Sequence, residues 1–219
     1  MARALVTGGN RGIGLELCRQ LAARGDEVIA ACRKSSAELD ALGVRVIEGV
    51  EVGAADAVAH LAREVGDTPL DLLVNNAGIL TVERFGELDF ERIQRQFEVN
   101  SLGPLRVTEA LRDCLFSGSK VAVITSLMGS IADNGSGSYY GYRMSKAAVN
   151  AGAMSMARDL KARGITVLIL HPGMVATEMT GGRGISTDES ARGLLERIDA
   201  LGLEQTGTFW HSDGRELPW

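Results

Sequence analysis

The sequence predicts an α/β fold in which one doubly wound parallel sheet lies between two layers of helices, a three-layer αβα sandwich. Short β-branched runs alternate six times with longer segments of helical periodicity, which is the pattern of repeated βα units. The strand segments are apolar along their length, as expected for strands that are covered on both faces. Because crossovers between parallel strands are right-handed, these units build a doubly wound sheet.

The predicted elements follow one another without a linker or a tandem repeat. Strands are expected at about 3–7, 27–32, 44–48, 71–74, 120–125 and 165–170. Helices are expected at about 12–24, 54–65, 89–115 and 140–163, and the third is expected to be interrupted near Asn100 and Pro104. Gly- and Ser-rich segments at 133–138 and 180–186 are interpreted as mobile loops near the site. At 219 residues the chain is predicted to form one domain, 1–219.

Composition excludes several classes of protein. A hydrophobic share of 45% with 23% charged residues is typical of a globular protein, and a net charge of -5 argues against a nucleic-acid partner. No apolar run approaches the length of about 18 residues that a membrane span needs. The first residues leave no room for a secretory signal, and Cys18, Cys32 and Cys114 are scattered without metal-ligand spacing. We therefore expect a cytoplasmic protein with reduced thiols, no membrane span and no metal site.

A glycine-rich turn follows the first strand. Residues 7–14 are Thr-Gly-Gly-Asn-Arg-Gly-Ile-Gly, and a helical pattern begins directly afterwards. Glycines at Gly8, Gly12 and Gly14 permit a tight turn, a close approach of the backbone to a pyrophosphate and close packing of helix on strand. The helix N-terminus adds free N–H groups and a positive dipole. The turn is interpreted as a dinucleotide-binding site of Rossmann type, and a purely structural turn is the alternative.

The end of the second strand indicates which dinucleotide is bound. It has no Asp or Glu to hold the 2′-hydroxyl of NAD, and it carries Arg33 instead. A 2′-phosphate suits guanidinium groups, so Arg33 and Arg11 together favour NADP(H). Solvated surface charges are the alternative interpretation of both arginines.

Tyr142 and Lys146 form the most distinctive pair in the second half of the chain. Four residues apart on a predicted helix, they share one face. A phenol has a pKa of about 10, so bringing it close to neutrality takes about 4 kcal/mol of differential stabilisation of the phenolate. A nearby ammonium and a positive nicotinamide favour that change. Tyr139 and Tyr140 lack a lysine at the same spacing, so Tyr142 is the predicted acid/base.

These motifs, in this order, resemble the short-chain dehydrogenase/reductase family. The resemblance covers residues 3 to 177 and rests on the glycine turn, Asn-Asn-Ala-Gly at 75–78, Asn100, Ser-x-x-Gly at 126–129, the Tyr-Lys pair and Pro-Gly-x-Val-x-Thr at 172–177. The short region after Thr177 and the tail resemble the branch of sniffer-type carbonyl reductases and the bacterial C-factor. Two departures are Glu51, where the family usually has Asp, and a slightly long spacing between Ser126 and Tyr142.

The resemblance implies roles for these residues. Ser126, favoured over Ser130, would bind the carbonyl oxygen; Lys146 would assist Tyr142 and hold the nicotinamide ribose, and Asn100 would anchor a water. His171 is not expected to act as an acid/base. NADP(H) would contact the glycine turn, the second strand, the Asn-Asn-Ala-Gly segment, the Tyr-Lys pair and the Pro-Gly segment. The predicted cofactor-binding residues are Gly8, Asn10, Arg11, Gly12, Ile13, Gly14, Arg33, Asn76, Ala77, Gly78, Tyr142, Lys146, Pro172, Gly173, Val175 and Thr177.

The resemblance also implies an activity and an assembly. We expect reduction of a small-molecule aldehyde or ketone to an alcohol, with a short substrate loop around 178–190 and an open pocket. A dinucleotide-binding, C-factor-like signalling protein with little turnover is the alternative. Family members commonly pair through the two long helices, so a homodimer is favoured, although their apolar residues equally suit the core. These residues are Leu105, Leu111, Leu115, Val149, Ala153 and Met156.

Overall fold

The computed structural model describes all residues from 1 to 219 and contains one sheet of seven parallel strands. The strand order is β3-β2-β1-β4-β5-β6-β7, so the chain winds outward from β1 in one direction, returns beside β1 and continues in the other. The predicted doubly wound α/β fold is therefore confirmed. The strands are β1 (Arg3–Thr7), β2 (Glu27–Ala31), β3 (Arg45–Ile47), β4 (Leu70–Asn75), β5 (Leu115–Ile124), β6 (Thr166–His171) and β7 (Phe209–His211).

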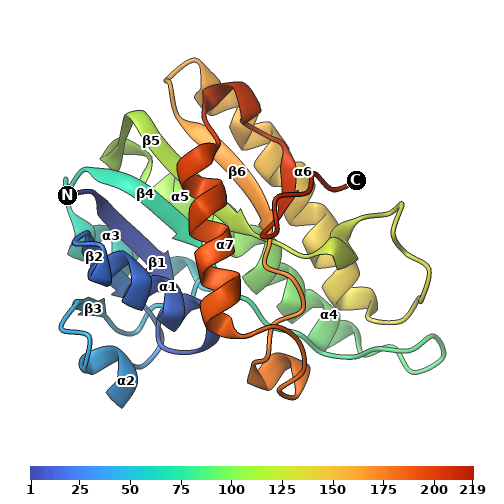
Figure 1. The fold of residues 1–219 in the computed structure, drawn as a ribbon. Helices are drawn as coiled ribbons and strands as arrows, with labels where there is room; N and C mark the ends of the chain where they lie inside the picture. Colours follow the sequence, from blue (N-terminus) through green and yellow to red (C-terminus); the bar gives the residue numbers. More distant parts are fainter.

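Helices cover both faces of this sheet. Two apolar cores result, one beneath α3, α5 and α6 and the other beneath α1 and α7. Figure 1 shows α1 and α7 in front of the sheet and α5 behind it. This is the predicted three-layer sandwich. The helices are α1 (Gly12–Ala23), α2 (Ala37–Asp40), α3 (Ala55–Val65), α4 (Phe90–Phe97), α5 (Gly103–Ala110), α6 (Tyr140–Lys161) and α7 (Thr187–Ala200).

The helix expected over 89–115 is divided into two, and the prediction is wrong for its last five residues. A π-helical turn at Glu98–Leu102 separates α4 from α5, so the interruption near Asn100 is real. Pro104 lies in the first turn of α5, directly after the π-helical turn, and its missing N–H cannot donate to the carbonyls of that turn. The helix stops at Ala110, and β5 already begins at Leu115, five residues before the expected start.

Two short elements have no counterpart among the predictions. Strand β7 has three residues, lies last in the strand order beside β6, and is bridged on its other side by Glu216. Helix α2 has four residues, and its first turn is capped by the Ser36 side chain. Elements of this length show too few periodic positions to be recognised in a sequence.

The topology brings the sequence motifs to one edge of the sheet. The order reverses between β1 and β4, and the segments that follow the carboxyl ends of β1, β2, β4, β5 and β6 carry the predicted site residues. In open parallel sheets, ligands bind in the crevice at this switch point. The candidate site is therefore assembled by strands that lie far apart in the sequence. None of the helices is both long and apolar enough to cross a membrane.

Candidate active site

The glycine turn between β1 and α1 has the geometry of an anion cradle. Gly8 and Gly12 have φ angles of +69° and +55°, which side chains rarely adopt. A Cβ on Gly14 would lie 2.2 Å from the carbonyl oxygen of Gly8, so the helix start and the turn pack in direct contact. No side chain caps the N-terminus of α1, and no acidic residue stands in its first turn. These residues fit a bound pyrophosphate, because the free N–H groups and the helix dipole favour negative charge.

The two predicted phosphate-binding arginines both have carboxylate neighbours. Arg11 pairs with Glu178, which lies across the glycine turn in the segment after β6. Arg33 lies 3.8 Å from Glu51, and Glu51 is also bound by Arg95 at 2.8 Å. Arg11 and Arg33 remain largely exposed, so these pairs are screened by water and exchange readily for a stronger anion.

The Asn-Asn-Ala-Gly segment after β4 is fastened to the glycine turn. The Asn76 side chain donates a 2.9 Å hydrogen bond to the carbonyl of Thr7, and the hydroxyl of Thr7 accepts from the backbone N–H of Ala77 at 3.1 Å. Gly78 lies close to Lys146, because a Cβ on Gly78 would be 3.8 Å from the Lys146 Nζ atom. Asn10 is held separately, through a 3.0 Å hydrogen bond from its amide to the carbonyl of Lys34.

Asn100 is 1% exposed and lies in the π-helical turn. Its side-chain nitrogen donates to the carbonyl of Ile79 at 2.8 Å and to the hydroxyl of Ser145 at 3.0 Å. Its side-chain oxygen accepts from the N–H of Ile79 at 2.9 Å. A buried amide requires such partners, and here they join the π-helical turn to α6 and to the loop after β4. Any water at Asn100 would therefore be held by its main chain.

Tyr142 and Ser126 meet at the edge of the sheet. Ser126 follows β5, and Tyr142 lies in the first turn of α6. Burial raises the pKa of Tyr142 to about 12, and a side-chain hydrogen bond with Ser126 opposes this rise. The competing Ser130 hydroxyl instead accepts from the backbone N–H of Asp133. The expected acidification of the phenol by Lys146 is not produced by the protein alone, so the phenol is protonated at neutral pH, as a proton donor must be.

Lys146 lies beside Tyr142 on the same face of α6, as its spacing predicts. Its Nζ atom is 5.7 Å from the centre of the Tyr142 ring and donates a 2.9 Å hydrogen bond to the carbonyl of Ile124. Burial lowers the pKa of Lys146 to about 8, because a buried ammonium loses its hydration. Lys146 thus loses its proton at a lower pH than an exposed lysine would, although at pH 7 it is still mainly an ammonium beside the phenol.

The buried ammonium should reduce stability in a way that depends on pH. Lowering the pKa from 10.5 to about 8 corresponds to a cost of about 3 kcal/mol at pH 7, and the hydrogen bond to Ile124 returns about 1 kcal/mol. Lys146→Met should therefore raise the free energy of unfolding at pH 7 by about 2 kcal/mol. Since the unfolded chain binds the extra proton between pH 8 and 10.5, wild-type stability rises through this window and the difference shrinks. Urea unfolding at both ends of the window measures it.

Lys161→Met is the matched control, because Lys161 is an exposed residue near the end of the same helix. It should leave the free energy of unfolding nearly unchanged at every pH. A Lys146→Met variant that is less stable than wild type at pH 7 would contradict this prediction. It would show that interactions other than the hydrogen bond to Ile124 offset the desolvation cost of the ammonium.

The segment after β6 forms the opposite wall of the site. Pro172 and Val175 are buried, Gly173 has a φ angle of +84°, and the Thr177 Cγ2 atom would lie 3.4 Å from a Cβ on Gly12. The Pro-Gly segment therefore faces the glycine turn across the cleft. Nine residues, 178–186, separate Thr177 from α7, as expected for a short substrate loop. Its two ends are joined by hydrogen bonds between Ile185 and the backbone of residues 174 and 176.

His171 is the last residue of β6 and directly precedes the Pro-Gly segment. Burial lowers its pKa to about 3, and the neighbouring charges of His211 and Lys146 act in the same direction. The rings of His171 and His211 meet edge to face, with their centroids 4.8 Å apart. At neutral pH the His171 imidazole is uncharged and has no imidazolium proton to give, which supports excluding it as an acid/base.

One contributor to the site escapes sequence analysis altogether. Glu83 is 1% exposed, and its carboxylate accepts from the backbone N–H of Gly141 at 3.1 Å, in the first turn of α6. The amide of Gln96 donates to the same carboxylate at 3.1 Å. Glu83 thereby orients the helix that carries Tyr142 and Lys146. Nothing near Glu83 in the chain signals this role, because its partner lies 58 residues away.

Comparisons with known proteins agree with this geometry. The sequence model of the short chain dehydrogenase family matches residues 2–187. The chain is 43% identical to 1-hydroxy-2-glutathionyl-2-methyl-3-butene dehydrogenase of Rhodococcus sp. (strain AD45), over the full length of both proteins. It is also 43% identical to the C-signal protein of Myxococcus xanthus, over 72% of this chain and 98% of that protein.

Solved structures show the same fold. The NADPH-bound carbonyl reductase from chicken fatty liver superposes with a TM-score of 0.92 at 28% identity, covering 100% of this chain and 99% of that one. The carbonyl reductase Sniffer of D. melanogaster has the same TM-score and identity, with 100% of both chains covered. Sequence motifs, fold and relatives therefore agree, and the chain belongs to the short-chain dehydrogenase/reductase family.

Proposed function

We propose that this protein is an NADP(H)-dependent oxidoreductase that reduces an aldehyde or ketone to an alcohol. The observation that carries the proposal is the meeting of Tyr142, Ser126 and Lys146 at the carboxyl edge of the sheet, opposite the glycine turn. The NADPH-bound carbonyl reductase of the same fold supports this choice of cofactor and substrate class. The uncapped start of α1 suits the pyrophosphate of such a cofactor.

The side chains divide the reaction between them. When bound, the cofactor supplies the hydride to the carbonyl carbon. Tyr142 donates its phenolic proton to the carbonyl oxygen, and Ser126 donates a hydrogen bond to that oxygen as negative charge develops on it. Lys146 stabilises the resulting phenolate and binds the nicotinamide ribose. Asn100 anchors, through its main chain, a water that leads a replacement proton from solvent.

Arg11 and Arg33 are proposed to bind the 2′-phosphate of NADP(H). Replacing Arg33 by Ala should weaken NADPH binding by about 10- to 100-fold, the usual range for one charged hydrogen-bonding group, and leave NADH binding unchanged. Fluorescence titration with both cofactors measures the ratio. Arg45→Ala is the matched control. Arg45 is an exposed arginine on the neighbouring strand β3, and it is paired with Glu64 of α3. Equal losses for NADPH and NADH in the Arg33 variant would remove the arginine from 2′-phosphate recognition.

NADPH oxidation with a panel of aldehydes, ketones and quinones tests the activity itself. Turnover with at least one carbonyl compound is the expected result, and binding of NADPH without turnover on the whole panel would support the signalling alternative. The likeness to the C-signal protein covers 72% of this chain, whereas the likeness to the Rhodococcus dehydrogenase covers all of it. The complete Asn-Ser-Tyr-Lys set also favours the enzyme.

A homodimer is proposed through α5 and α6. Leu111, Leu115, Val149 and Ala153 belong to the core, but Leu105, Met156 and Leu160 are half-buried along a surface groove between these helices. Sedimentation velocity should give twice the monomer mass of 23.2 kDa. Met156→Glu should shift the protein towards monomer, because an unpaired carboxylate in an apolar interface is costly to desolvate. A monomeric wild-type protein would contradict the proposal.

The proposed organisation is a single catalytic domain, 1–219, with residues 178–190 shaping the substrate pocket. A cytoplasmic location is proposed because Cys18, Cys32 and Cys114 are buried free thiols rather than disulfides.

A further inference from the structure

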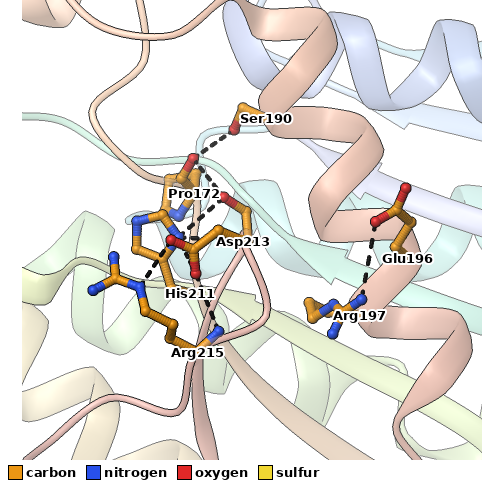
Figure 2. Close-up of polar contacts among 8 residues, drawn as sticks. Pro172, Ser190, Glu196, Arg197, His211, Asp213 and Arg215 are labelled. Carbon is orange, nitrogen blue, oxygen red and sulfur yellow. Dashed lines mark hydrogen bonds and ion pairs between the residues drawn. The ribbon is translucent and has the colours of Figure 1, made fainter.

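The carbonyl oxygen of Pro172 is held by two buried hydroxyl groups. Ser190 of α7 donates to it at 2.8 Å, and Ser212, which follows β7, donates to it at 3.2 Å. Ser190 is fully buried and Ser212 is 6% exposed. Figure 2 shows Ser190 on its helix pointing at Pro172, with His211 and Asp213 beside them. His211 and Asp213 belong to a C-terminal hairpin, residues 209–217, in which β7 pairs with residues 215–217. Two side chains from separate elements thus meet at one peptide group.

The surrounding backbone brings these serines into place. The N–H of Ser212 donates to the carbonyl of His171 at 2.9 Å, so Ser212 binds two successive carbonyls of the chain leaving β6. Gly193 lies one turn after Ser190 on α7, and a Cβ there would be 2.5 Å from the carbonyl oxygen of Ser212. The glycine allows the hairpin to pack directly on the helix.

Holding one carbonyl orients the whole peptide that contains it. The six atoms of the Pro172–Gly173 peptide lie in a plane, so fixing the oxygen also fixes the direction of the Gly173 N–H. Proline itself has a restricted φ angle, and Gly173 adopts its φ of +84° directly after this peptide. A carbonyl oxygen has two lone pairs, and the two serine hydroxyls use both of them. The orientation of the Pro172–Gly173 peptide is therefore fixed by the two serine hydroxyls.

We propose that Ser190 and Ser212 are positioning residues that hold the Pro172–Gly173 peptide in the orientation needed to receive the nicotinamide half of the cofactor. This inference rests on the proposed function, since it concerns the same site. The serines act through the peptide and touch neither substrate nor cofactor. The C-terminal hairpin thereby becomes part of the cofactor site, although it follows all the sequence motifs of the family.

Two probes separate this role from a general effect on folding. NADPH carries the nicotinamide, whereas adenosine 2′,5′-bisphosphate carries the adenosine with its 2′- and 5′-phosphates and has no nicotinamide, so it probes only the other end of the cleft. Ser190→Ala and Ser212→Ala should each weaken NADPH binding by about 3- to 10-fold, the equivalent of one ordinary hydrogen bond. Neither should change binding of the bisphosphate. Titration calorimetry with both probes gives the ratio.

Ser119→Ala is the matched control. Ser119 is as buried as Ser190 and donates a 2.7 Å hydrogen bond to the carbonyl of Leu70, at the amino end of the sheet and away from the site. It should lower the melting temperature without changing the ratio of the two affinities. Ser190→Cys, which keeps the volume of the side chain and a weak donor, replaces Ser190→Ala if the alanine variant does not fold.

An unchanged affinity ratio in both serine variants, or equal weakening of both probes, overturns the positioning role while leaving the proposed function standing. A wild-type protein that binds neither probe overturns the proposed function, and the positioning role with it. A loss confined to NADPH in the serine variants, with none in Ser119→Ala, supports the inference.

Discussion

Replacing Tyr142 by Phe should reduce carbonyl reduction by about 1000-fold, within the range usual for loss of a general acid. The phenol is buried and protonated at neutral pH, and the Ser126 side chain acts to lower its pKa, so it is the proton donor that the site provides. Removing one oxygen leaves the ring and its packing intact. NADPH binding should therefore stay largely intact, and steady-state kinetics together with fluorescence titration separate the two effects.

Tyr140→Phe is the matched control for this variant. Tyr140 begins the same helix, but its ring packs near Phe85 at 6.4 Å between centroids, and no lysine follows at the required spacing. It should keep near-normal turnover. If Tyr142→Phe also kept near-normal turnover, Tyr142 would not be the proton donor.

Gly14→Ala should abolish NADPH binding and lower stability, although alanine is normally the better helix former by about 1 kcal/mol. The added Cβ would lie 2.2 Å from the carbonyl oxygen of Gly8 and 2.5 Å from the side-chain nitrogen of Asn76. Both contacts are far shorter than atoms tolerate, and one is with backbone that cannot yield alone. The glycine turn must move, so the anion cradle is lost. Calorimetric titration with NADPH and thermal unfolding measure both consequences.

Gly152→Ala makes the same change inside α6 and serves as its control. There the new Cβ would meet only the Leu105 side chain, at 3.3 Å, and a flexible side chain can shift by a few tenths of an ångström. NADPH binding should be retained, and stability should not fall appreciably. Retained binding in Gly14→Ala would mean that the turn does not hold the pyrophosphate.

The local motifs were predictable because each depends on a few neighbouring residues. A tight turn needs its glycines at fixed positions, and a spacing of four residues places Tyr142 and Lys146 on one helical face whatever surrounds them. Asn100 was recognisable because an amide inside an apolar helical pattern requires partners. The α/β alternation likewise determined the sheet and its layers, apart from the three-residue strand β7 and the early start of β5 at Leu115.

By itself, then, the sequence determined the doubly wound fold, the glycine turn and the spacing of Tyr142 and Lys146. The tertiary structure alone decided that burial raises the pKa of Tyr142 and lowers that of Lys146, and that Ser126 meets the phenol while Ser130 does not. It alone also brought Glu83, Ser190 and Ser212 to the site. The physical reason is that spacing reports local backbone geometry, whereas desolvation and hydrogen-bond partners depend on segments that only folding brings together.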